Sequence, residues 1–94
     1  MRAIGITRGG LSGAAEVERI ERYCGLHRWQ LTASELWPAG VPELGPLVTR
    51  VEETGAGCVL LPREVLSELE REYPHLWGTV RARLERRGVF TIAV

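Results

Sequence analysis

Four short apolar segments alternate with amphipathic stretches along this 94-residue chain, and this alternation constrains the fold more than any other feature. The apolar segments are rich in Ile, Val and Leu, which is typical of strands. The stretches between them repeat apolar residues at spacings of three and four, which is typical of helices that bury one face. The predicted strands are 2–7, 29–36, 58–61 and 89–94, and the predicted helices are 12–28, 44–54 and 65–87.

The order β-α-β-α-β-α-β predicts an α/β domain of three layers, with a mainly parallel four-stranded sheet and helices on both faces. A chain of this length has room for one core, so residues 1–94 are expected to form a single domain. Pro74 lies inside the last helical stretch and must kink or divide it, and Gly88 is expected to end it.

The composition excludes several kinds of chemistry. Every basic residue other than His is Arg and every acidic residue is Glu, twelve of each, so the formal net charge is zero. The chain contains no Asp, Lys or Asn. A Walker-type phosphate loop, an Asp-dependent triad and Schiff-base chemistry are therefore excluded. A zero net charge also argues against a dedicated binder of nucleic acid or membranes, although a local basic patch is compatible with it.

The two cysteines, Cys24 and Cys58, lie far apart without a Cys-x-x-Cys spacing or a neighbouring His. They are expected to be core thiols, and neither a metal site nor a cofactor is expected. The sequence shows no signal peptide and no apolar run long enough to cross a membrane. We therefore expect a cytoplasmic protein with reduced thiols.

Three stretches resemble the catalytic domain of the serine recombinases, the resolvase/invertase family. Residues 1–8 are similar to the family's opening strand, which typically ends in Tyr-x-Arg-x-Ser. Residues 18–29 resemble its first helix and the turn that follows, and residues 83–89 resemble the entry to its fourth strand. The resemblance implies a resolvase-like fold over nearly the whole chain, with strand order two, one, three, four.

The family cuts and rejoins DNA with a serine nucleophile and several phosphate-binding arginines, and this chain departs from that pattern. Arg8 matches the strand arginine, but the nucleophile position is Gly10. Where the family has Asp-Arg-Leu-x-Arg, residues 64–68 are Glu-Val-Leu-Ser-Glu, so Val65 and Glu68 replace two arginines. The arginine expected before the second helix has no match near 43–46. Such losses should abolish turnover, and the chain is not expected to be an enzyme.

The resemblance also leads to an expectation about the missing parts of the family's architecture. The long dimerisation helix and the C-terminal DNA-binding domain of the family are expected to be lacking. We expect a catalytically inactive recombinase-like domain that acts as a protein-interaction, regulatory or assembly module in a bacterial cytoplasm. One alternative is a DNA-associated accessory protein that retains the family's contact surface. Another is a residual strand-transfer enzyme that uses Ser12 and Arg8.

The loop after the first strand is a candidate anion site. Arg8 supplies a cation, while Gly9, Gly10 and Ser12 precede a helix whose main-chain N–H groups and dipole favour negative charge. The alternative is a tight turn that needs glycine, followed by a Ser12 N-cap.

Four apolar residues are candidates for a protein interface. Trp37 lies in a proline-rich loop and Trp77 lies close to Pro74, although both could instead pack over the rim of the sheet. Phe90 and Ile92 lie in a last strand without charge or proline, and such an edge usually finds a partner. We therefore expect a homodimer or a complex with another protein.

A basic cluster near the end of the last helix is the feature that would favour DNA. Arg81, Arg83, Arg86 and Arg87 lie within seven residues. The alternative is that they complement the negative end of the helix dipole and solvate its outer face.

Overall fold

The computed structural model describes residues 1–8, 13–37 and 45–94, with the side chains of 33–37 outside the description. Strands and helices alternate as predicted, with a helix pair before the last strand. The elements in chain order are β1 (Arg2–Arg8), α1 (Gly13–His27), β2 (Gln30–Trp37), α2 (Gly45–Thr54), β3 (Cys58–Leu61), α3 (Arg63–Glu72), α4 (Pro74–Arg86) and β4 (Phe90–Ala93).

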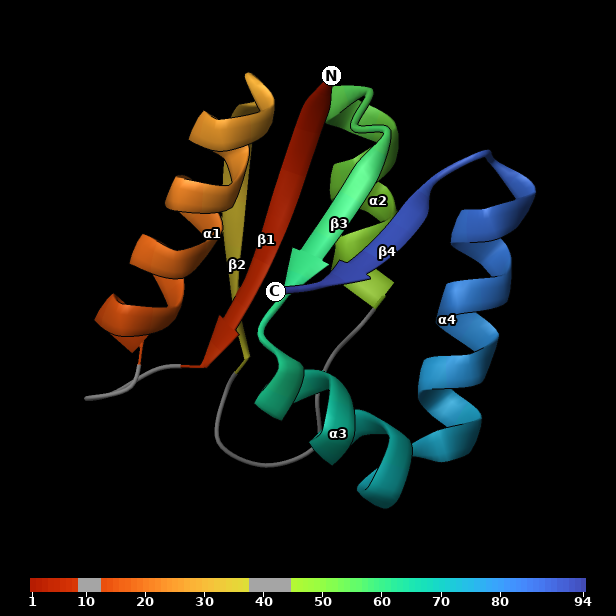
Figure 1. Cartoon of the computed structure of the whole chain (residues 1–94). Helices are drawn as coiled ribbons and strands as arrows, with labels where there is room; N and C mark the ends of the chain where they lie inside the picture. Colours follow the sequence, from red (N-terminus) through yellow and green to blue (C-terminus); the bar gives the residue numbers. More distant parts are fainter. Residues whose placement is uncertain (9–12, 38–44) are drawn as a thin grey trace.

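The four strands form one parallel sheet in the order β2-β1-β3-β4 (Figure 1). This arrangement confirms the predicted α/β class and the strand order that the resemblance implied. The two inner strands, β1 and β3, are buried along almost their whole length. Both faces of β3 are buried, and its sequence, Cys-Val-Leu-Leu, therefore shows no alternation of apolar and polar residues.

The helices cover the two faces of the sheet unequally. On one face α1 packs Ile20 and Cys24 against alternate residues of the inner strands. On the other face α2, α3 and α4 together form a larger cluster with Ile4 and Val59. Figure 1 shows α1 over the β2–β1 half of the sheet, at a distance from β4. The β4 half of the α1 face therefore has less cover, and Ile92 and Val94 there are half-buried.

Pro74 divides the last helical stretch, as predicted. Tyr73 ends α3 with φ −134°, and Pro74 opens α4 at a position where its missing N–H costs nothing. Gly88, with φ +74°, follows the end of α4 in the left-handed conformation predicted for it.

Trp77 belongs to the core, and its prediction as an interface residue is wrong. It is 2% exposed and shares the buried face of α4 with Val80 and Leu84. The spacing of three and seven residues along the helix turns all three side chains toward the sheet. No helix within the described part of the chain is long and apolar enough to cross a membrane.

The end of β1 and the start of α1 approach each other very closely. A Cβ atom added to Gly13 would lie 2.6 Å from the main-chain oxygen of Arg8. Only a residue without a side chain fits at this distance. Gly13 therefore lets α1 begin directly beside the carboxyl end of β1.

Candidate functional site

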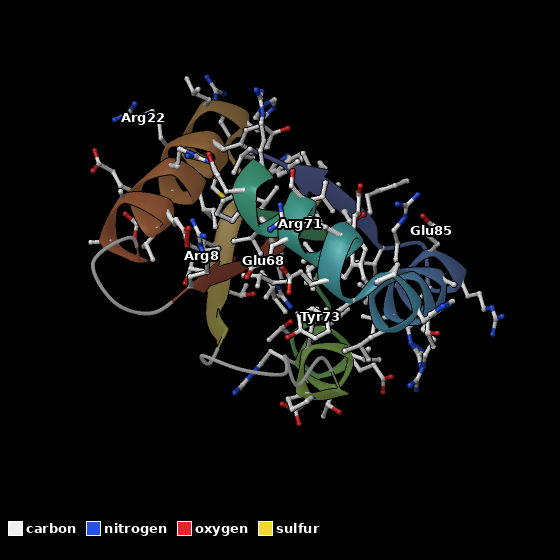
Figure 2. All side chains as sticks on the ribbon, turned by 90° about the horizontal axis from the view of Figure 1, so that it is seen from below. Arg8, Arg22, Glu68, Arg71, Tyr73 and Glu85 are labelled. Atoms are coloured by element: carbon white, nitrogen blue, oxygen red, sulfur yellow. The ribbon has the colours of Figure 1, made fainter. Side chains whose placement is uncertain are left out.

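The topology indicates where a ligand would bind, namely along the side of the sheet formed by the carboxyl ends of its strands. This side is the edge meant in this section and the next. The chain leaves β1 toward β2 on one side and leaves β3 toward β4 on the other. In open parallel sheets, ligands bind beside the carboxyl ends of the strands at such a reversal. The residues to examine are therefore those that follow β1 and β3. Figure 2 views the molecule from this edge, with α3 crossing it.

Arg8 at the end of β1 is engaged by an acidic residue of α1. The carboxylate of Glu16 accepts hydrogen bonds from the main-chain N–H of Arg8 at 2.8 Å and from its Nε at 3.0 Å. Glu16 is 5% exposed and Arg8 is 37% exposed. A buried carboxylate thus neutralises the cation on one side and fixes its direction.

Arg19 ties α1 to the beginning of α3 and to the end of the chain. Its guanidinium donates to Glu64 Oε2 at 2.8 Å and to the main-chain oxygen of Val94 at 2.8 Å. The hydrogen bond from Arg19 lowers the pKa of Glu64 below its ordinary value, and the same bond raises the pKa of Arg19. Both groups are therefore charged at neutral pH, and each neutralises the other.

Val65 and Glu68, which the resemblance to serine recombinases sets at arginine positions, provide no positive charge here. Val65 is fully buried in the larger core cluster, where an arginine side chain would not fit without rearrangement. Glu68, from the next turn of α3, is half-buried and lies on the same side of the molecule as Arg8 (Figure 2). A carboxylate at this position would repel a phosphate.

The hydroxyl group next to Arg8 in β1, that of Thr7, is not accessible as a nucleophile. The Oγ1 of Thr7 is fully buried and has no hydrogen-bond partner among the described residues. Gly9, Gly10 and Ser12 of the predicted anion site lie outside the described residues, so only its Arg8 is placed. The described residues also contain no cluster of His, Cys or Glu that could hold a metal ion.

Two of the remaining interface candidates lie on the outer strand β4. Phe90 opens β4 with 62% of its side chain exposed, and Ile92 follows on the same strand, half-buried. The side chain of Trp37 is outside the description. Phe90 and Ile92 therefore lie on the same strand, and their participation in a protein interface stays a prediction.

Two residues of the candidate site, Glu16 and Arg19, are not among the site residues predicted from the sequence. The signal for Glu16 is its spacing, because it precedes Ile20 and Cys24 by four and eight residues and all three are buried on one stripe of α1. The position of Arg19 depends on α3 and β4, which are far away in the sequence.

A solved structure shares this arrangement over almost the entire chain. The N-terminal catalytic domain of TP901-1 integrase matches it with a TM-score of 0.73, covering 99% of this chain and 76% of that one. The chain has the serine recombinase catalytic domain fold. The sequence identity is 17%, so the likeness to the integrase domain is one of fold. No protein-family model matches the chain, and no curated protein matches it.

Proposed function

We propose that this chain is a recombinase-like domain that no longer performs DNA strand transfer and acts through contacts with other proteins. The observation that carries the proposal is the pairing of Arg8 with Glu16. Arg8 is the residue that matches the strand arginine of the recombinases, and here its charge is directed at a buried carboxylate. A carboxylate that compensates the charge of this guanidinium weakens its stabilisation of a phosphate.

The neighbouring residues support the same conclusion. Arg19, a second cation near this edge, is bound to Glu64 and Val94. Val65 and Glu68 stand where the recombinase pattern has arginines. Phosphoryl transfer depends on fixed positive groups around the phosphate, and loss of a single stabilising group can cost about 10²–10³ in rate. Loss of several of these groups together removes useful turnover.

The experiment is a search for the covalent protein–DNA adduct that a serine nucleophile would form. The full chain is incubated with supercoiled plasmid and with labelled duplexes, then denatured and examined for nicks and for protein-bound label. We expect neither, in wild type or in Ser12→Ala. An adduct formed by wild type and lost in Ser12→Ala would overturn the proposal, because the hydroxyl of Ser12 would then act as the nucleophile.

One surface favours a second candidate, a DNA-associated accessory protein. Arg83 and Arg86 line a shallow hollow on α4 together with His75, and none of the described residues that line it is acidic. Duplex DNA binding that weakens steeply as salt rises would support this candidate. Replacing both arginines with alanine should then remove the binding. If the chain does not bind duplex DNA even at low salt, the proposal that it acts through contacts with other proteins is favoured.

A further inference from the structure

The outer edge of β4 offers unpaired main-chain groups. Among the described strands, β4 pairs with β3 alone. The N–H groups of Phe90 and Val94 donate to the β3 side, at Gly57 and Leu61. Because successive residues of a strand direct their main-chain groups to opposite sides, Thr91 and Ala93 present theirs outward.

The side chains of this strand do not protect its edge. Ile92 and Val94 pack on the face of the sheet that α1 covers. Phe90 precedes them by two and four residues, so its side chain points to the same face. These three apolar residues form a strip on the part of the sheet that α1 covers least. The strand carries neither a charge nor a proline, the devices that commonly keep an exposed edge from pairing.

A groove runs beside the outer edge of β4, on the face of the sheet opposite to α1. It has a volume of about 250 Å³ and lies between β4 and α4, with Arg81 and Glu85 on the helix side. The Nε of Arg81 lies 3.1 Å from Glu85 Oε1. Figure 1 shows that α4 and β4 run in opposite directions, so Arg81 lies toward the carboxyl end of β4 and Glu85 toward its amino end.

We propose that a second copy of this chain pairs with the edge, β4 antiparallel to β4, with the two-fold axis at Ile92. Thr91 then exchanges main-chain hydrogen bonds with the partner's Ala93, and Ala93 does so with the partner's Thr91. Ile92 faces the partner's Ile92 as a pair without hydrogen bonds. The result is one sheet that continues through both copies. This inference names the partner within the proposed function and depends on it.

Charge and shape favour a second copy over an unrelated strand. The two-fold axis brings Arg81 toward the partner's Glu85 and Glu85 toward the partner's Arg81, so unlike charges meet on both sides of the axis. The same register sets exposed Phe90 opposite the partner's Val94, which covers the ring. A surface that is complementary to itself in both respects is what an isologous dimer requires.

The experiment is disulfide formation at the axis. In Ile92→Cys, the two new cysteines would occupy a pair whose Cα atoms are about 4.5 Å apart, which suits a disulfide. Phe90→Cys is the matched control, since its partner copy would lie about 13 Å away along the strand. We expect Ile92→Cys to form a cross-linked dimer under mild oxidation and Phe90→Cys to form none. The native thiols are buried and do not interfere.

Sedimentation of the unmodified chain provides an independent readout. We expect the mass to rise with concentration from that of one copy to that of two. Thr91→Pro removes an outward N–H from each copy without touching the bonds to β3, and should weaken association by about tenfold or more. Thermal melts monitored by circular dichroism would verify that each variant folds.

A chain that stays monomeric at all concentrations and does not cross-link through Ile92→Cys would overturn the dimer. Equal cross-linking of Ile92→Cys and Phe90→Cys would overturn the register, because it would indicate random collision. Neither result bears on catalysis, which the search for the DNA adduct decides separately. Failure of the dimer is thus distinguishable from failure of the proposed loss of strand transfer.

Discussion

The carboxylate of Glu16 holds both the main chain and the side chain of Arg8, at 2.8 Å and 3.0 Å. The contact joins the end of β1 to the first turn of α1. It therefore has a structural role that is independent of any phosphate. The proposed loss of strand transfer is therefore compatible with the presence of Arg8, which the structure engages in this contact.

Arg8→Ala should destabilise the fold, because it leaves the buried Glu16 carboxylate without its cation. Removing one partner of a fully buried pair costs about 3–5 kcal/mol, and the partial exposure of Arg8 reduces the expected loss to about 1–3 kcal/mol. Urea denaturation at pH 7 measures it. The control is Arg22→Ala, which breaks an exposed pair with Glu18 and should cost less than about 0.5 kcal/mol. Equal losses in the two variants would contradict the structural role.

Gly13→Ala should destabilise the domain by more than about 1 kcal/mol. The added methyl group would meet the main-chain oxygen of Arg8 at 2.6 Å, and neither backbone can move without disturbing the Arg8–Glu16 contact. Gly25→Ala is the matched control, because it lies within α1 with no atom near the added Cβ. It should stabilise by about 0.5–1 kcal/mol through helix propensity. The same sign of change in both variants would refute the steric argument.

The interaction of Arg19 with Glu64 should depend on pH. The folded protein lowers the pKa of Glu64 from its ordinary 4.5, so the ionised carboxylate favours folding above that value. This contribution is lost as the pH falls through the lower folded pKa. A double-mutant cycle with Arg19→Ala and Glu64→Gln should show coupling at pH 7 that declines toward pH 3. Coupling of equal size at both pH values would exclude the ion pair as its source.

The two native cysteines should resist thiol reagents while the protein is folded. Burial raises the pKa of the Cys58 thiol to about 11 and raises the pKa of Cys24 as well, so thiolate is scarce at pH 8. Labelling by a chromogenic disulfide reagent should therefore proceed only as fast as the protein opens. Leu26→Cys, at a position that is 77% exposed, should label within the mixing time. Rapid labelling of the native thiols in folded protein would contradict their burial.

Trp77 should tolerate Phe much better than Ala. Its side chain is buried, and its Nε1–H has no hydrogen-bond partner among the described residues, so Phe loses little beyond ring volume. We expect a loss of at most about 1.5 kcal/mol for Trp77→Phe and about 3–5 kcal/mol for Trp77→Ala. Urea midpoints give both values. A loss for Phe as large as that for Ala would indicate that the indole N–H is bonded.

The architecture could be predicted from local patterns because each element carries its own periodicity. The strand at 58–61 was located from four consecutive apolar residues, and the strand predicted at 29–36 lies at Gln30–Trp37, one residue later. Pro74 indicated the division between α3 and α4 for the same local reason. These features depend on neighbours in the sequence.

The candidate site was less predictable, because its contacts join distant elements. Arg19 reaches Glu64 and Val94, separated from it by 45 and 75 residues. Trp77 was predicted as an interface candidate because it lies close to Pro74, whereas the proline opens α4 and the tryptophan lies on the buried face of that helix. Only the arrangement of the helices around the sheet determines such positions.

The position of β1 and β3 inside the sheet has a consequence for how the domain opens. Both strands are hydrogen-bonded on two sides and covered on two faces, whereas Arg8, Arg19 and Glu64 lie beyond or around their ends. Amide hydrogens of Ile4 and Val59 should thus exchange only through complete unfolding, and those of β4 through smaller fluctuations. Because the most protected backbone is separate from the exposed pair of Arg19 and Glu64, substitutions of that pair should leave the inner strands folded.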